Sequence, residues 1–565
     1  MAGGGGGRAA SPAAPKSARA APSKKAATTP APGRTKAQST RTAHRGLVHP
    51  LVVAGAVAVI LGVLYLAAPL MGQDLSAQIA HADFARDHPL KPVDFRWFGG
   101  SLSFGYSLYV PILAAYVGPQ VLGVVAAVAA TLLSTTIFVK AGLRRPMLGG
   151  VFAAATQVAN LTEGRIAFAV GLTFALAAVL PLVNREGGYR LWSAVAAALA
   201  GAANPVAGLF VLVVALTVLV HGRVADAVRL FLGAAVGTAS VSLLFADGGP
   251  FVYAGGDAAR AAAVTVLVAL LVPRWTSYLW TGAAVGVAMV AAAYLFSTPV
   301  GANASRLAML FAIPVIAAAA EFVWWRVAAA IVAAAVIQTP FVFGTITSAG
   351  EPVTRPGYFT PLVERIEAGG PLTGRVEIPE VTGHWESAYV AREFPLSRGW
   401  LRQVDIELWD STFYGDDGPT AAAYQAFLRR TSTQYVAVPD ARLTFYGGRE
   451  ATLIAGGLPY LREVWRDDTW TLYAVAGATP VVSAPASKVT FDAADISFTA
   501  PAEAEVTISA RWFRWLTLDS TDGTACIEPT GTDDDATVLL RAGAGGTYTL
   551  TSSLTGDHRR CADSG

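Results

Sequence analysis

The sequence predicts an α-helical polytopic membrane domain followed by an extracytoplasmic α/β domain and a C-terminal β-sandwich. Of the 565 residues, 53% are hydrophobic and 14% are charged, which is too apolar for an ordinary soluble protein. The apolar excess ends near residue 345, and the rest of the chain has the polarity of a globular protein. Near the C-terminus, short stretches in which apolar and polar residues alternate are typical of a β-sandwich. The predicted parts are therefore residues 1–46, 47–345, 346–480 and 481–565.

The N-terminal part is expected to be a disordered basic tail. Residues 1–46 hold nine Lys or Arg residues and no acidic residue, and too little apolar surface to fold. The tail could bind anionic lipid headgroups, or it could be solvated and only fix the topology. A nucleic-acid role is not expected, because no aromatic residues interleave with the basic ones. The run at 47–70 is long enough to span a bilayer, which argues against a cleaved signal peptide.

Eleven apolar runs predict about eleven membrane helices. They lie near 47–70, 119–140, 146–161, 164–184, 189–204, 205–221, 225–246, 259–273, 276–296, 302–320 and 324–345. The basic tail places the N-terminus in the cytoplasm, and an odd number of spans then places the chain after residue 345 outside the plasma membrane. The predicted cytoplasmic connections are short and carry arginine, as this orientation requires. The first external connection, residues 71–118, is long and polar and contains an aromatic stretch that could form an interfacial helix.

Polar residues at the ends of the apolar runs are predicted to face outside, and Asp74 is the first of them. A carboxylate at the edge of the hydrocarbon needs a partner or water, and a partly desolvated carboxylate suits a general base. Alternatively, Asp74 caps the next helix. Asp83 is a second candidate for a site residue, or a solvated residue of that helix.

Two further breaks carry candidate binding residues. Asn160, Glu163 and Arg165 could form a polar floor for a sugar or a phosphate group, or Glu163 and Arg165 could simply neutralise each other. Asn303 and Arg306 precede another apolar run. An arginine fork at a helix N-terminus matches a phosphate, although Arg306 could instead extend to the membrane interface.

The external half contains α/β signals and then β signals. Val376–Ile378, Tyr435–Val438 and Trp470–Val475 are predicted strands, and Ala421–Arg430 is a predicted helix. The loop residues His384-Trp385-Glu386 and Arg398-Gly399-Trp400 are candidates for a sugar-binding cleft, or alternatively for core or membrane-docking contacts. Cys526 and Cys561 are both in the last part, where an oxidising compartment favours a disulfide, with two free thiols as the alternative.

Several phrases resemble actinobacterial polytopic proteins related to the GT-C superfamily. They are Gln73-Asp74-Leu75, the break at 160–165, "GRVEIPEVTGHWESAYVA", "SRGWLRQVD" and "QYVAVPD", and the resemblance covers most of residues 47–480. It implies a polyprenyl-phosphate-sugar-dependent glycosyltransferase with Asp74 as catalytic base and with Arg306 and Arg165 holding the lipid phosphate. Many members have two adjacent acids in the first external loop, whereas Leu75 follows Asp74 here.

The resemblance implies three kinds of partner: a lipid-linked sugar donor, an acceptor glycan or lipid of the cell envelope, and the membrane. It implies no firm cofactor, and the seven scattered histidines show no spacing for a divalent metal. Two other functions are also compatible with a protein that has many membrane spans. A transporter would place its polar groups near mid-membrane between repeats, and a non-catalytic scaffold would only bind envelope components through its external domains.

Overall fold

The computed structural model describes residues 3, 49–184, 190–338, 342–531 and 536–561. The predicted disordered tail at 1–46 lies outside the described residues, apart from Gly3. From residue 48 to residue 565 the chain belongs to a single unit. The helical part and the parts that follow it can therefore be described together.

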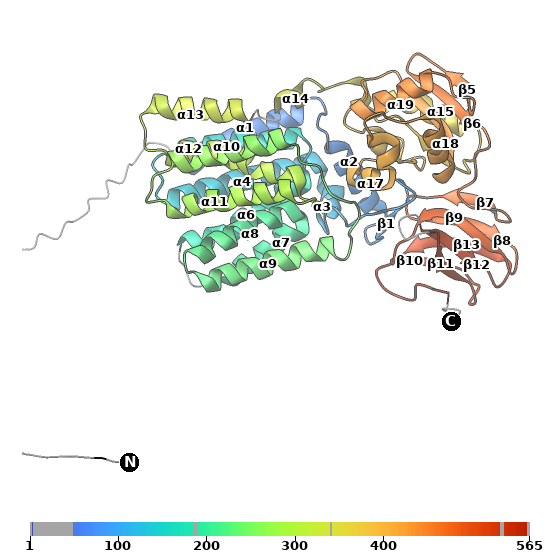
Figure 1. Ribbon diagram of the computed structural model, residues 1–565, viewed down its shortest axis with the longest axis horizontal. Helices are drawn as coiled ribbons and strands as arrows, with labels where there is room; N and C mark the ends of the chain where they lie inside the picture. Colours follow the sequence, from blue (N-terminus) through green and yellow to red (C-terminus); the bar gives the residue numbers. More distant parts are fainter. Residues whose placement is uncertain (1–2, 4–48, 185–189, 339–341, 532–535, 562–565) are drawn as a thin grey trace, which may run out of the picture. The chain divides into compact units, whose positions relative to one another are not determined.

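Helices form at the positions of all eleven predicted apolar runs within the described residues. They are α1 (Pro50–Ala67), α4 (Pro119–Lys140), α5 (Pro146–Thr162), α6 (Ile166–Asn184), α7 (Arg190–Ala203), α8 (Pro205–Val220), α9 (Val224–Ser242), α10 (Gly255–Leu271), α11 (Ser277–Leu295), α12 (Arg306–Ala319) and α13 (Trp324–Ile337). Four of them begin at a proline. Proline suits the first position of a helix, because a backbone N–H at that position has no hydrogen-bond partner within the helix and proline has no N–H. The helices lie side by side in a bundle (Figure 1).

The length of these helices bears on how many of them cross a membrane. Six stretches within the described residues are long and apolar enough by length and composition: α1, α4, α6, α9, α11 and the stretch Gly301–Ala319. The helices α7, α8 and α13 are apolar but shorter. A helix of 14 residues reaches only about 21 Å, less than the roughly 30 Å hydrocarbon core. The prediction of about eleven spans is thus confirmed only as a set of apolar helices.

Residues 71–118 connect the bundle to the rest of the unit. This segment contains α2 (Leu75–Asp87), β1 (Val93–Asp94), β2 (Ser101–Leu102) and α3 (Val110–Val117). Leu75 and Trp97 are buried in the core of the α/β part, whereas Val93 and Leu102 belong to the core of the sandwich. Val110 packs into a core of the bundle. The first connection is therefore a structural hub, and the helix predicted from its aromatic stretch is confined to α3.

The α/β part is built on one mixed sheet. Its strands are β3 (Arg375–Glu377), β4 (Thr433–Pro439), β5 (Leu461–Arg466) and β6 (Trp470–Val475), in the order β3-β4-β6-β5. The β3–β4 pair is parallel and the other pairs are antiparallel. Its helices are α15 (Thr360–Glu367), α16 (Glu386–Tyr389), α17 (Arg402–Trp409), α18 (Ala421–Arg430) and α19 (Phe445–Ala455), with two short 3-10 helices, η3 (Pro352–Thr354) and η4 (Pro356–Tyr358), and a π-helical turn, η5 (Asp410–Tyr414). The short helix α14 (Val342–Ile346), which precedes this part, packs on α5 of the bundle.

The C-terminal part consists of two antiparallel sheets around a shared core, as the alternating pattern predicts. The order in one sheet is β10-β13-β8-β7 and in the other β11-β12-β9. The strands are β7 (Ser487–Phe491), β8 (Ile496–Ala500), β9 (Glu505–Arg511), β10 (Leu516–Asp519), β11 (Cys526–Thr530), β12 (Thr537–Arg541) and β13 (Gly546–Ser552). Cys526 and Cys561 form a disulfide, which confirms that prediction.

Candidate functional site

The start of α2 packs directly on the break between α5 and α6. The N–H of Asp74 donates to the carbonyl oxygen of Glu163 at 2.9 Å. Gly164 has φ +81°, and a Cβ there would overlap the backbone nitrogen of Leu75. Gly72 has φ +115°, and its Cβ would lie 2.7 Å from the carbonyl carbon of Glu163. Glycine at both positions is what permits two segments far apart in the sequence to touch.

This contact joins three of the predicted site residues. Nε of Arg165 lies 3.6 Å from Oδ2 of Asp74, and its Nη2 lies 3.7 Å from Oε2 of Glu163. Asp74 occupies the N-cap position of α2, but its side chain makes no capping hydrogen bond. The ion pair with Arg165 therefore replaces the capping role that the sequence also allows. The alternative in which Glu163 and Arg165 only neutralise each other does not describe the geometry, because Arg165 is shared with Asp74.

The protonation state of Glu163 affects the net charge of the group formed by Asp74, Glu163 and Arg165. Burial raises the pKa of Glu163, and the Arg165 guanidinium and a hydrogen bond from the Thr345 hydroxyl only partly oppose this. A raised pKa favours the neutral carboxyl. Arg306 adds a second guanidinium to this group.

Arg306 reaches the same group from the start of α12. Its guanidinium lies 5.1 Å from the centre of the Phe168 ring, and Tyr106, Asp74 and Arg165 are close enough to interact with it electrostatically. Burial raises the pKa of Tyr106 to about 12, so this phenol is neutral. We call Asp74, Tyr106, Glu163, Arg165 and Arg306 the bundle-end cluster.

The α/β part reaches the bundle-end cluster through Trp400. Its indole N–H donates to the carbonyl oxygen of Gln73 at 2.8 Å, and its ring meets the Tyr106 ring edge-on at 5.9 Å. The sequence interpretation that includes Trp400, a sugar-binding cleft or core or membrane-docking contacts, does not place it beside Asp74, and Tyr106 is expected only within the aromatic stretch of the first connection. The aromatic stretch after residue 103 and the phrase "SRGW" were the signals that could have indicated them.

Within the described residues, we identify no hydrogen bond or ion pair between the side chains of the remaining predicted residues, Asp83, Asn160 and Asn303, and the bundle-end cluster. Asn160 is buried in the last turn of α5 and its Nδ2 has no partner among the described residues. The carbonyl oxygen of Asn303 accepts the N–H of Arg306. Asp83 forms ion pairs with Arg86 at 3.1 Å and with Arg392, which tie α2 to the α/β part.

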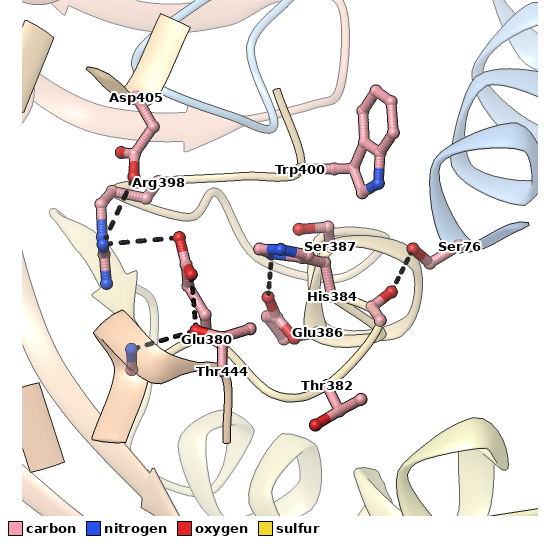
Figure 2. Close-up of polar contacts among 12 residues, drawn as sticks. Ser76, Glu380, Thr382, His384, Glu386, Ser387, Arg398, Trp400, Asp405 and Thr444 are labelled. Carbon is pink, nitrogen blue, oxygen red and sulfur yellow. Dashed lines mark hydrogen bonds and ion pairs between the residues drawn. The ribbon is translucent and has the colours of Figure 1, made fainter. Parts of the chain in front are cut away.

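A second group of charges is buried inside the α/β part, close to α2 (Figure 2). Its centre is Arg398, which is 4% exposed. The guanidinium lies 2.8 Å from Glu377, 3.4 Å from Asp405 and 3.7 Å from Glu380, and it also pairs with Glu450. We call these five residues the Arg398 cluster. Carboxyl groups surround the arginine of this cluster and neutralise its charge, so we interpret the cluster as a structural feature of the α/β core.

His384 borders the Arg398 cluster and the start of α2. It has φ +53°, and Nδ1 lies 3.4 Å from Oε1 of Glu386, which Figure 2 shows facing it. Burial by itself would lower the pKa of His384, but the charges of Glu380 and Glu386 raise it. On the other side of the loop, the Ser76 hydroxyl donates to the carbonyl oxygen of Gly383 at 2.6 Å. Among the interpretations that the sequence left open for these residues, core contacts describe Trp385 and Arg398, because both side chains are buried.

Comparisons with protein-family models, with curated proteins and with solved structures find no match to this chain. In the part of the chain that the structure describes, no group of three or more His, Cys, Asp or Glu side chains is arranged to hold a metal ion.

Proposed function

We propose that this protein is a membrane glycosyltransferase of the GT-C type. It would transfer a sugar from a polyprenyl-phosphate donor to a glycan or lipid acceptor of the cell envelope at the outer face of the plasma membrane. The observation that carries the proposal is the bundle-end cluster, in which a carboxylate without a capping role meets two guanidinium groups at the ends of apolar helices.

The charges of the cluster suit such a transfer. Asp74 would accept the proton of an acceptor hydroxyl while the oxygen of that hydroxyl bonds to the anomeric carbon of the sugar. The bond between that carbon and the phosphate oxygen breaks, and the phosphate leaves with the electron pair. Arg306 and Arg165 would stabilise the charge that develops on the phosphate.

Two further features support this assignment. Tyr106 and Trp400 place aromatic rings next to Asp74, and aromatic faces pack well against the C–H groups of sugars. The disulfide between Cys526 and Cys561 favours an oxidising compartment for the C-terminal part. That location agrees with an N-terminus in the cytoplasm and external domains on the outer side.

The test uses the full-length protein in lipid nanodiscs with radiolabelled farnesyl-phosphate arabinose or farnesyl-phosphate mannose and with arabinan or mannan oligosaccharides as acceptors. We expect transfer by the wild type and at least about a hundredfold lower transfer by Asp74→Asn, the loss typical of a missing general base. Asp87→Asn is the matched control, because this carboxylate lies on the same helix but is exposed. It should keep wild-type activity.

The outcomes separate the three functions. Unchanged transfer by Asp74→Asn would refute the role of Asp74. A wild-type protein that transfers neither sugar but moves the donor across a bilayer would be a transporter, and one that only binds the oligosaccharides would be a scaffold. Arg306→Gln should raise the KM for the donor if Arg306 holds the phosphate. Melting curves of each variant, followed by tryptophan fluorescence, show whether it is folded.

A further inference from the structure

The start of α2 is also held from the α/β part, by the loop between β3 and α16. The hydroxyl of Ser76, the second residue of α2, donates to the carbonyl oxygen of Gly383 in this loop at 2.6 Å, and the Ser76 side chain is buried. Figure 2 shows Ser76 facing the loop that carries His384. Asp74 lies two positions before Ser76, so this contact adjoins the bundle-end cluster.

Glycines keep the loop, the start of α2 and the break between α5 and α6 in direct contact. Gly383 has φ +81°, and a Cβ there would lie 2.9 Å from Nε1 of Trp385 and 3.3 Å from the carbonyl oxygen of Gly72. Gly72 in turn packs on the backbone of Glu163. Closely packed groups transmit a displacement because they leave no space to absorb it. A shift of the Gly383 carbonyl would therefore move the residues around Asp74.

His384 follows Gly383 and holds an uncommon backbone conformation. Its φ of +53° lies in the left-handed region, which residues other than glycine seldom adopt. Such a conformation persists only where neighbouring contacts maintain it. The N–H of His384 donates to the Val381 carbonyl oxygen at 2.9 Å, and its carbonyl oxygen accepts the N–H of Ser387 at 3.1 Å. Its Nδ1 lies 3.4 Å from Oε1 of Glu386, so the side chain ties the loop to the first residue of α16.

The imidazole of His384 lies in the field of several charged groups. They are Glu380 before the loop, Glu386 on α16, and Asp405 and Arg402 on α17. The carboxyl groups favour the protonated ring and the arginine opposes it, while α2 meets the loop with the uncharged Ser76. Arg398 also pairs with Glu380, at 3.7 Å. Burial alone lowers the pKa of His384, but Glu380 and Glu386 outweigh burial and the pKa ends above its ordinary value. The contacts of the loop are therefore strongest while the ring is protonated.

We propose that His384 is a positioning residue for the proposed transfer, whose protonated side chain keeps the Gly383 carbonyl against Ser76 and so fixes the start of α2. Loss of the proton would remove the cation that the acidic neighbours share, loosen the loop and displace Asp74. The transfer rate would then fall as the pH rises through the value at which the ring loses its proton. The effect on activity rests on the proposed function, whereas the effect on the start of α2 does not.

The first measurement is hydrogen–deuterium exchange of the full-length protein in nanodiscs at about pH 6, read by mass spectrometry on peptides that cover residues 72–80. His384→Asn removes the charge of the ring, while asparagine still tolerates the left-handed backbone. We expect exchange of these amides to be at least about threefold faster than in the wild type. His88→Asn is the matched control, because this histidine caps the other end of α2 and lies 3.8 Å from Asp492. It should exchange like the wild type over residues 72–80.

The second measurement is the pH profile of the transfer rate between about pH 5.5 and 9. Glu386→Gln keeps the size of the side chain but removes the carboxylate beside Nδ1 of His384. The alkaline fall in rate should begin about one pH unit lower in this variant, because a nearby opposite charge stabilises the protonated ring by at least that much. A merely structural contact would lower the rate equally at every pH and leave the midpoint of the fall unchanged.

The two measurements separate a failure of this proposal from a failure of the proposed function. If the wild type transfers no sugar but His384→Asn exchanges faster over residues 72–80, His384 positions α2 and the transfer function is wrong. The proposal is overturned if His384→Asn and His88→Asn exchange equally over these residues. It is also overturned if transfer occurs and Glu386→Gln keeps the wild-type midpoint. Melting curves show whether each variant is folded, and the conservative Glu386→Gln variant decides the question if His384→Asn does not fold.

Discussion

Replacing Arg398 with methionine is expected to destabilise the α/β part severely. The guanidinium lies 2.8, 3.4 and 3.7 Å from the oxygens of Glu377, Asp405 and Glu380. At an effective dielectric constant of about 20, each such pair attracts by about 4–6 kcal/mol. Desolvation and repulsion among the carboxyl groups cancel much of this. The expected net loss is about 3–5 kcal/mol, as for other buried pairs that lose one partner.

The penalty should depend on pH in a defined direction. Burial alone would lower the pKa of Arg398, but Glu377 and the other carboxylates raise it well above its ordinary value, so it is charged throughout. Burial raises the pKa of Glu377 and Glu450. At pH 5 these carboxyl groups bind protons more readily than at pH 8, so fewer negative charges remain without a partner in the variant. The loss caused by Arg398→Met should therefore be smaller at pH 5 than at pH 8.

The assay is thermal unfolding of the full-length protein in detergent, followed by tryptophan fluorescence and limited proteolysis. At pH 8 we expect a fall in Tm of about 10 °C or more, since 1 kcal/mol corresponds to about 2–4 °C for a domain of this size class. Adding Glu377→Gln and Glu450→Gln to Arg398→Met should restore part of the loss, because the unpaired carboxylates are removed.

The control for this prediction is Arg462→Met, which removes an exposed arginine of the same sheet. It should change the free energy of unfolding by no more than about 0.5 kcal/mol. The reasoning would be refuted if Arg398→Met and Arg462→Met melted within 2 °C of each other at about pH 8. It would equally fail if the penalty grew as the pH was lowered.

Three other predictions concern the transfer site, the sandwich and the α/β part. Gly164→Ala should cost about 1–3 kcal/mol from backbone strain alone and should lower transfer activity, whereas Gly118→Ala, at a positive φ but in open space, should leave activity unchanged in the same assay. Cys526→Ser or Cys561→Ser opens a link between residues separated by 35 positions, which should cost about 4 kcal/mol by loop entropy; equal Tm values with and without reductant would contradict this. Burial raises the pKa of Asp405 to about 6, above an unfolded value of about 4. The folded chain then holds this proton more tightly, so the stability present below about pH 4 is lost as the pH rises through about 6. Asp405→Asn should flatten this part of a stability–pH curve, and an unchanged slope would show that the group does not titrate there.

Local features of the fold could be predicted from the sequence. The apolar run at 119–140 and the predicted helix at 421–430 have the bounds of α4 and α18, and the predicted strand at 470–475 has the bounds of β6. Helix hydrogen bonds join residues four apart, and strand alternation has a period of two. Both are therefore written into short windows of sequence.

The partners of Asp74 could be predicted only in part. The sequence singled out Glu163, Arg165 and Arg306 as polar residues at helix ends, and the structure brings Asp74 and Arg165 within 3.6 Å of each other. The sequence could not show that Asp83, the other candidate carboxylate near the start of this segment, pairs instead with Arg86 and Arg392. The two acids differ in which neighbours the packing of α2 gives them.

What the sequence determined by itself is the division into an apolar helical part and a polar, sheet-rich part, together with the positions of most helices. Burial of apolar surface and local hydrogen bonding are sufficient for that. The tertiary structure alone decided that Arg398 is surrounded by carboxyl groups and that Arg375 is buried with no carboxylate partner among the described residues. Both are arginines beside strand residues in the sequence. Their different surroundings depend on contacts between segments far apart in the chain, which no local pattern records.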